Sequence, residues 1–225
     1  MILLLLLAQT PQLGNATEAV AALRRPDGVE AVQAACRGRL RHELRDHPGL
    51  LAEVRRQVEA GQKAPLELFR CFTAPKFATV LEVGLRGAPE LAAYSAEVAA
   101  RFEAPAAVAP VLAVAEASVA ECEGPLQGAA KDRCVWLTYA PGTGVATDPA
   151  LAQRARKLAL QLLQAQSAKV REVAVETLAA AGTSADVAAL KLLISKEKSG
   201  AFAEPNDPAL LKRFESRAVA LSKKK

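Results

Sequence analysis

The sequence predicts an all-α fold, a right-handed α-solenoid of stacked antiparallel helix pairs. Apolar residues make up 51% of the 225-residue chain but aromatic residues only 4%. The core must therefore be built mainly from Ala, Leu and Val, and the first two are strong helix formers. Apolar residues also recur at helical spacing, most clearly over 167–196. Finally, an Asp-Pro-Ala-Leu helix start occurs twice, at Asp148 and Asp207, which is the recurrence that a repeat architecture predicts.

The chain opens with an apolar run, Met1 to Ala8, that is too short to span a bilayer as a helix. The run is typical of the hydrophobic region of a secretory signal peptide, and Gly14 and Ala16 are spaced as the small residues before a cleavage site. We therefore expect a signal peptide at 1–16, which lacks the usual basic n-region, with Ala8 as an alternative cleavage position. The other interpretation is a structural first turn of helix. A mature chain without this run would carry no transmembrane anchor.

Residues 17–225 are expected to form a single array of helix pairs. Pro75 separates a short pair and Pro105 a longer one, because proline cannot continue a helix. The four helices expected around these breaks cover 66–72, 77–85, 89–102 and 106–122. Asp148 and Asp207 then open two basic amphipathic helices, each with Asp as the N-cap and Pro in the first turn.

Four cysteines, an even number, suit an exported chain whose thiols can pair in an oxidising compartment. Three pairings are possible. We favour Cys36 with Cys71, which lie about one repeat apart where neighbouring helices would meet. Cys122 would then pair with Cys134 across a segment that contains Gly and Pro. The alternative is four buried free thiols in a cytosolic protein.

The segment 123–147 departs from the helical pattern and contains Trp136 and Tyr139 among Gly and Pro residues. We expect it to be an irregular insertion between repeats. Because long loops in compact folds often carry function, this segment is the first place to look for a partner site. The alternative is that Trp136 simply fills the core at an irregular junction.

Residues 167–196 predict two helices joined by a tight turn. The first helix has one apolar face, formed by Val170, Val173, Ala174, Leu178 and Ala181. Gly182 permits the left-handed conformation that commonly ends a helix. Thr183 and Asp186 have the spacing of a capping box for the second helix. The apolar stripe of that second helix consists of Val187, Leu190, and Leu193 or Ile194.

This two-helix unit resembles a bacterial HEAT repeat of the type also found in phycobilin-lyase-like proteins. The resemblance is carried by the residues that match the repeat's Val-Arg, Ala, Leu, Gly and second-helix apolar positions: Val170, Arg171, Ala174, Leu178, Gly182, Asp186, Val187 and Leu190. Ser167 stands where the family commonly has an Asp before the Val-Arg pair. The resemblance implies a HEAT/armadillo-like superhelix, whose repeated helix pairs form an extended surface for another protein.

The sequence motifs predict no catalytic, metal or cofactor site. His42 and His47 are about 140° apart around a helix axis, whereas the zinc-protease helix needs His at positions i and i+4. Gly142-Thr143-Gly144 lacks the Gly-Lys-Ser/Thr ending of a phosphate-binding loop. The chain contains neither a Cys-x-x-Cys pair nor a Gly-x-Ser-x-Gly elbow. We therefore expect a protein without enzymatic activity.

Charge is distributed unevenly along the chain, whose net charge is +5. Residues 1–88 carry 12 basic and 9 acidic side chains, residues 89–130 carry 1 and 6, and residues 131–225 carry 16 and 9. A nucleic-acid-binding protein is expected to present a continuous basic stripe, and the acidic middle interrupts such a stripe. Nucleic acid is therefore a disfavoured partner.

The candidate partner-binding residues are two aromatic residues of the insertion and basic residues on the helices that follow: Trp136, Tyr139, Arg154, Arg156, Lys157 and Arg171. Most such basic clusters are ordinary solvated faces. The leading hypothesis is a periplasmic or secreted HEAT-like scaffold that binds another protein and needs no cofactor. One alternative is a cytosolic helical-repeat protein that binds nucleic acid or another polyanion through its basic C-terminal helices. Another is a HEAT-like lyase.

Overall fold

The computed structural model describes residues 13–145 and 147–224. Within these ranges every regular element is a helix and no strand occurs, which confirms the all-α prediction. The same ranges contain no helix that is both long enough and apolar enough to cross a bilayer. The chain divides into two compact units, 1–80 and 81–225, and the boundary falls within α5 (Ala74–Leu85).

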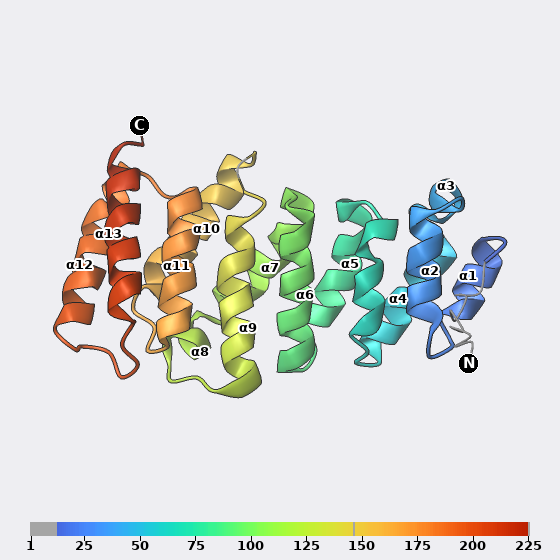
Figure 1. The fold of residues 1–225 in the computed structure, drawn as a ribbon, viewed down its shortest axis with the longest axis horizontal. Coiled ribbons are helices and arrows are strands. Elements are labelled where there is room, and N and C mark those ends of the chain that lie inside the picture. Colours follow the sequence, from blue (N-terminus) through green and yellow to red (C-terminus); the bar gives the residue numbers. More distant parts are fainter. Residues whose placement is uncertain (1–12, 146, 225) are drawn as a thin grey trace, which may run out of the picture. The chain divides into compact units, whose positions relative to one another are not determined.

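The described part of the first unit is built from short helices around a shared core (Figure 1). Before α5 these are α1 (Ala16–Ala22), α2 (Gly28–Arg37), α3 (Arg41–Leu44), α4 (Pro48–Glu59) and the 3₁₀ helix η1 (Ala64–Cys71). Helix α2 contacts α1, α3 and η1, and α4 contacts α1 and η1. The core between them includes the fully buried Leu44, Leu50, Val54, Leu66 and Leu68. Residues 1–12, which hold most of the predicted signal peptide, lie outside the described residues.

Side-chain caps fix two helix starts in the first unit. Helix α1 follows Asn15, whose Oδ1 accepts a hydrogen bond from the amide of Glu18 at 2.9 Å. Helix α4 begins at Pro48 and follows His47, whose Nδ1 accepts a hydrogen bond from the amide of Leu50 at 3.2 Å. These bonds satisfy amides that the helix itself leaves without partners. One of the two histidines in the chain therefore has a structural role.

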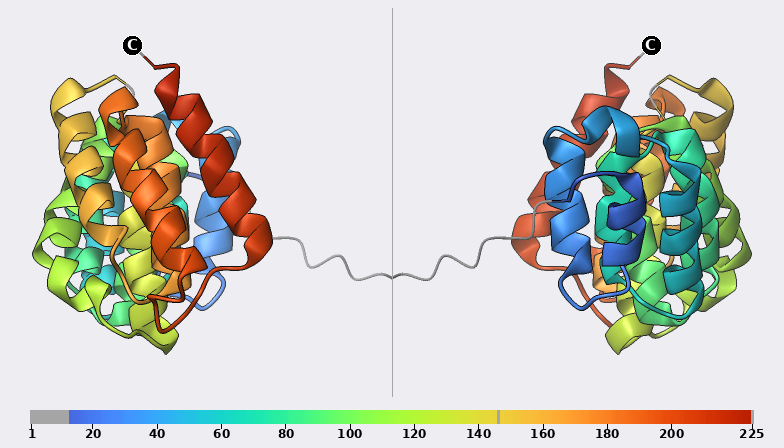
Figure 2. Two further views of the ribbon diagram at one scale, coloured as in Figure 1. Left: turned by 90° about the vertical axis from the view of Figure 1, so that its left-hand side faces the viewer. Right: turned by 90° about the vertical axis from the view of Figure 1, so that its right-hand side faces the viewer.

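The second unit contains longer helices that contact one another, with short helical elements between some of them. After the end of α5 these are α6 (Pro89–Phe102), α7 (Pro105–Ala117), α8 (Val119–Glu123), α9 (Gly128–Tyr139), η2 (Ala140–Gly142), α10 (Pro149–Leu162), α11 (Ala168–Ala181), η3 (Ser184–Asp186), α12 (Val187–Lys198) and α13 (Pro208–Ser222). Helix α9 contacts α6 and α11, and α11 also contacts α13 (Figure 1). Helix α10 contacts α7, α8 and α11, and the left view in Figure 2 places α10 and α13 on opposite sides of the unit.

The two predicted Asp-Pro helix starts are confirmed. The carboxylate of Asp148 accepts hydrogen bonds from the amides of Ala150 and Leu151, at 3.0 and 3.1 Å, where α10 begins. The carboxylate of Asp207 accepts a hydrogen bond from the amide of Ala209 at 2.6 Å, where α13 begins. Each helix has Pro as its first residue, a position at which the missing amide hydrogen costs nothing.

The turn between α11 and α12 confirms one prediction and corrects another. Thr183 and Asp186 form the predicted capping box. Gly182 ends α11 as expected, but its φ of −81° is not the left-handed conformation that was predicted. A Cβ atom at this position would lie 2.4 Å from the carbonyl oxygen of Leu178. Glycine is required here by close approach of the backbone and not by handedness.

The predicted insertion at 123–147 contains a regular helix, α9, between an extended link and the η2 turn. Cys122 in α8 and Cys134 in α9 are joined with an S–S distance of 2.06 Å. Cys36 in α2 and Cys71 in η1 are joined with an S–S distance of 2.04 Å. Both bridges match the pairing favoured from the sequence.

Candidate partner-binding surface

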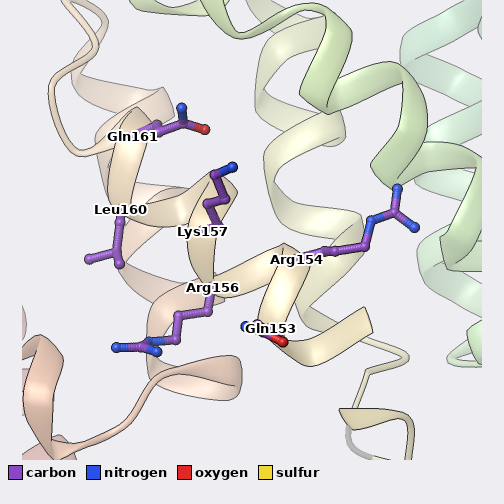
Figure 3. A pocket seen from close by; sticks show the side chains of 6 residues that line it. All are labelled: Gln153, Arg154, Arg156, Lys157, Leu160 and Gln161. Atoms are coloured by element: carbon purple, nitrogen blue, oxygen red, sulfur yellow. The ribbon is translucent and has the colours of Figure 1, made fainter. Parts of the chain in front are cut away.

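A shallow hollow of about 620 Å³ lies on the solvent-facing side of α10, and we call it the α10 hollow. The residues that line it all come from this one helix: Gln153, Arg154, Arg156, Lys157, Leu160 and Gln161. Figure 3 shows Arg154 and Arg156 leaving the helix in opposite directions, with Lys157 between them and Gln161 farther along the helix. Three of the predicted partner-binding residues therefore share one surface.

The amphipathic pattern of α10 explains why these side chains face outward. The buried residues of the helix recur at intervals of three and four: Leu151, Ala155, Leu158, Ala159 and Leu162. That stripe faces the neighbouring helices, so the residues between its members must lie on the opposite face. The Asp148 cap fixes the start of the helix and hence the register of both faces.

Arg154 is held by a two-point ion pair with Glu116 of α7. Its Nε and Nη2 donate to the two carboxylate oxygens at 3.0 and 2.8 Å. These hydrogen bonds lower the pKa of Glu116 more than partial burial raises it, and the charges of Arg154 and Lys157 lower it further. Both partners are 40% exposed, so the pair contributes little to stability but keeps the guanidinium at one edge of the hollow.

Arg156 forms a second two-point pair, with Asp186 at the start of α12. Nε and Nη2 of Arg156 donate to the carboxylate at 2.7 and 2.8 Å, and Asp186 is only 3% exposed. Burial raises the pKa of Asp186, but the hydrogen bonds from Arg156 and from Thr183 lower it by more, so the net shift is downward. This arginine therefore ties α10 to the turn that precedes α12.

Lys157 is the basic residue of the hollow whose charge is available to a partner. It is exposed, and no ion pair of its ammonium group is found within the described residues. Gln153 and Gln161 lie one turn before and one turn after it on the same face. The hollow therefore offers one ammonium group, two amides and the aliphatic carbons of Leu160 and of the arginine side chains.

Trp136 and Tyr139 form a second, separate feature on α9. Their rings meet edge to face, with centroids 5.7 Å apart. Tyr139 is 39% exposed and Trp136 is partly exposed. Neither residue lines the α10 hollow. An exposed aromatic pair is a common anchor in protein interfaces, because it supplies contact area at little entropic cost.

Arg171 does not lie with the other predicted partner-binding residues but is completely buried. Its Nε donates to Glu197 at 2.7 Å, its Nη1 donates to the carbonyl oxygen of Gln166 at 2.8 Å, and its Nη2 donates to that of Glu204. The ring of Phe202 lies 3.8 Å from its guanidinium carbon. A buried guanidinium must satisfy its donors within the protein, so Arg171 is not available to a partner.

Gln153, Leu160 and Gln161 also line the hollow, although they were not among the predicted partner-binding residues. Their spacing from Lys157 and Arg154 would have placed them on the same helical face, but they carry no charge and gave no motif. Over the described ranges no group of three or more His, Cys, Asp or Glu side chains is arranged to hold a metal ion. His42 lies exposed on α3, and His47 caps α4.

Comparison of the chain with protein-family models, with curated proteins and with solved structures found no match.

Proposed function

We propose that the protein is an exported, non-enzymatic scaffold of HEAT-like helix pairs that binds another protein, with the α10 hollow as part of the contact surface. The observation that carries the proposal is the exposed Lys157 between two arginines that are already paired within the fold. Such a surface combines one available charge with fixed polar and aliphatic groups. These are properties of a protein interface more than of a catalytic site.

The order of helix contacts in the second unit supports a solenoid. Helices α6, α9, α11 and α13 contact one another in sequence, while α7 and α10 contact each other beside them. In a stack of antiparallel helix pairs, every second helix belongs to the same layer, and each pair contacts mainly its neighbours. The α10 to α13 portion follows this pattern, and α8 with the link before α9 is the least regular part of the second unit.

Two features support export. Both cysteine pairs are at disulfide-bond distance, and stable disulfides form mainly in oxidising compartments. The chain also opens with the apolar run that resembles a signal peptide. A periplasmic or secreted location accounts for both features together.

The pairing of the C-terminal basic residues favours a protein partner over a polyanion. Arg213 and Arg217 of α13 pair with Glu176 of α11, and Lys198 pairs with Glu215. A nucleic-acid surface instead needs basic groups that can neutralise phosphates and release counterions. Binding of nucleic acid through these three basic groups would have to break their internal pairs.

Site-specific photo-crosslinking tests the proposal. A photoreactive amino acid placed at Gln161 in the α10 hollow should capture a protein in the native source, whereas the same group at the exposed Lys212 of α13 should not. The captured protein is then purified and its affinity measured. Lys157→Glu should weaken binding by roughly tenfold or more, and Lys212→Glu, which makes the same charge change, by less than about twofold.

The proposal fails if position 161 yields no protein that position 212 does not also yield. It also fails if the mature protein binds a polyanion such as heparin tightly and with steep salt dependence while no protein partner is captured. Intact mass measurement on material from the native source separately tests export. Processing near Ala8 or Ala16 with all four cysteines oxidised is expected, and a retained Met1 with free thiols would contradict it.

A further inference from the structure

A small cavity in the first unit is lined in part by three arginines. It has a volume of about 160 Å³ and is lined by Cys36, Arg41, Arg45, Arg70, Cys71 and Phe72. This arginine pocket contributes nothing to the surface proposed above for a protein partner, and it lies entirely within residues 1–80. The described residues that line this cavity therefore include three arginines and no acidic residue.

The three arginines come from two different elements. Arg41 is the first residue of α3 and Arg45 is the C-cap residue that follows it, so the two lie about one helical turn apart. Arg70 lies near the end of η1, with its guanidinium carbon 5.5 Å from the centre of the Phe69 ring. Like charges one turn apart repel each other, and an anion bound between them would relieve that repulsion.

None of these three guanidinium groups forms an ion pair with a described residue. The two carboxylates on or beside α3 are bound elsewhere. Glu43 accepts a hydrogen bond from the amide of Ala16 at 2.7 Å. Asp46 accepts hydrogen bonds from the amide and hydroxyl of Thr73, at 2.7 and 3.2 Å. The arginines of the second unit that flank the α10 hollow, in contrast, each have a carboxylate partner.

The backbone around the pocket is fixed by a disulfide bridge and by hydrogen bonds of Asp46. The Cys36–Cys71 bridge, with its Cα atoms 5.5 Å apart, joins α2 to the end of η1 within the pocket wall. The amide of Asp46 donates to the carbonyl oxygen of Cys71 at 3.1 Å, while its side chain binds Thr73. Asp46 has a φ of +56°, a conformation unusual for a residue with a side chain, and these bonds hold it there. Arg45 and Arg70, which neighbour these tethered residues, are therefore presented from preorganised backbone.

We propose that the arginine pocket binds a dianionic tetrahedral oxyanion, either a free ion such as sulfate or the phosphoryl group of a larger ligand. A volume of about 160 Å³ corresponds to roughly five water molecules, which suits a single anionic group and is too small for a whole drug-sized ligand. Guanidinium groups bind such oxygens in pairs, and three of them can match several oxygens at once. Because the lining side chains offer donors and no carboxylate acceptor, a fully ionised group fits better than one that carries a proton.

Isothermal titration calorimetry on the mature, oxidised chain tests this proposal at constant ionic strength. The probes are inorganic sulfate, inorganic phosphate, phenyl phosphate and acetate. Saturable binding of one equivalent of sulfate is expected, with acetate weaker by roughly tenfold or more because it has one charge and two oxygens. Phenyl phosphate that binds more tightly than inorganic phosphate would identify the phosphoryl group of a larger ligand as the source, and equal or weaker binding would favour the free ion.

Arg45→Gln and Arg70→Gln should each weaken sulfate binding by roughly tenfold or more. Arg25→Gln is the matched control, because Arg25 is exposed in the same unit, loses the same charge and does not line the pocket. It should change affinity by less than about twofold. Arg45→Lys retains the charge but not the planar pair of donors, so it should weaken binding by less than Arg45→Gln does.

Several results would overturn the proposal. These are no saturable sulfate binding up to roughly 10 mM, equal affinity for acetate and sulfate, or a loss in Arg25→Gln as large as that in Arg45→Gln. Circular dichroism and the melting temperature are measured for every variant, so that a loss of binding is scored only where the fold is retained. Since all the variants carry exposed substitutions, each is expected to fold.

Discussion

Replacing Arg171 by Met should destabilise the second unit strongly. Arg171 lies at 0% exposure in a network that joins α11 to α12 and to the loop before α13. Its guanidinium pairs with Glu197 and donates to backbone carbonyls on either side, including that of Glu204. Met has a similar apolar length but no donor, so Arg171→Met removes the charge while retaining much of the packing.

The size of the effect is set by the groups that Arg171 leaves behind. The side chain of Glu197 is 1% exposed, and among the described residues it would keep two neutral donors, the amide and the Nδ2 of Asn206, at 3.1 and 2.6 Å. Removing one partner of a buried ion pair costs about 3–5 kcal/mol, because the other charge stays buried without compensation. Water can replace the donors at the partly buried carbonyls, so we expect a loss of about 4 kcal/mol of unfolding free energy.

Urea unfolding followed by tryptophan fluorescence measures this loss. Trp136 is the only tryptophan of the chain and lies on α9 in the same unit, so its signal reports on the affected helices. Lys169→Met is the matched control, since Lys169 is 52% exposed in its pair with Glu172. The control should lose less than about 1 kcal/mol.

A double variant separates the charge from the packing. Replacing Arg171 and Glu197 together by Met removes both buried charges, so it should be less destabilised than the sum of the two single variants by about 2 kcal/mol or more. Additive losses, or a loss of less than about 1 kcal/mol in Arg171→Met, would refute the reasoning that this buried pair organises the C-terminal helices.

Three further predictions concern the first unit and are measured by circular dichroism. The hydrogen bond from Arg56 lowers the pKa of Glu53 from 4.5 to about 2 despite burial, so this carboxylate stabilises the fold above pH 4.5 and the contribution is lost as the pH falls towards 2. Because Arg56 is exposed, we expect the ionised Glu53 to contribute about 1–2 kcal/mol to the free energy of unfolding. Glu53→Gln should therefore lose less stability than the unmodified protein as the pH falls from 4.5 to about 2, and an equal loss would contradict this. Replacing Cys36 and Cys71 together by Ala opens a loop of 35 residues and should cost about 4 kcal/mol, and an equally stable variant would show that the bridge does not constrain the unfolded chain. Gly28→Ala should lower the free energy of unfolding by about 3 kcal/mol, because the added Cβ would lie 1.9 Å from a backbone oxygen of α1. An unchanged free energy of unfolding would mean that α1 and α2 can separate freely.

The elements that sequence analysis predicts best are those set by local chemistry. The Asp148 and Asp207 caps are found where the Asp-Pro spacing places them, because the side chain bonds to amides only two or three residues away. The end of α11 at Gly182 is also found, but for a different reason, since steric approach to Leu178 and not a left-handed φ requires the glycine. A sequence window shows that glycine is present but not which neighbour crowds it.

The role of each basic residue could not be predicted in the same way, because its partner lies far along the chain. Glu116 precedes Arg154 by 38 residues, and Glu197 follows Arg171 by 26. The family resemblance suggested an acid just before the Val-Arg pair, but Ser167 occupies that position. In this fold α12 supplies the carboxylate instead, which explains how Arg171 can be buried without a local acid.

Whether an arginine stabilises the fold or is free to bind a ligand therefore depends on its partners and not on the net charge of its unit. The two units have similar net charges, with 11 basic and 8 acidic residues in 1–80 and 18 basic and 16 acidic residues in 81–225. Arg154, Arg156 and Arg171 nevertheless each have a carboxylate partner within the second unit. The arginine pocket of the first unit gathers three guanidinium groups around a cavity without a described acid, so an external anion is the partner that its charge requires.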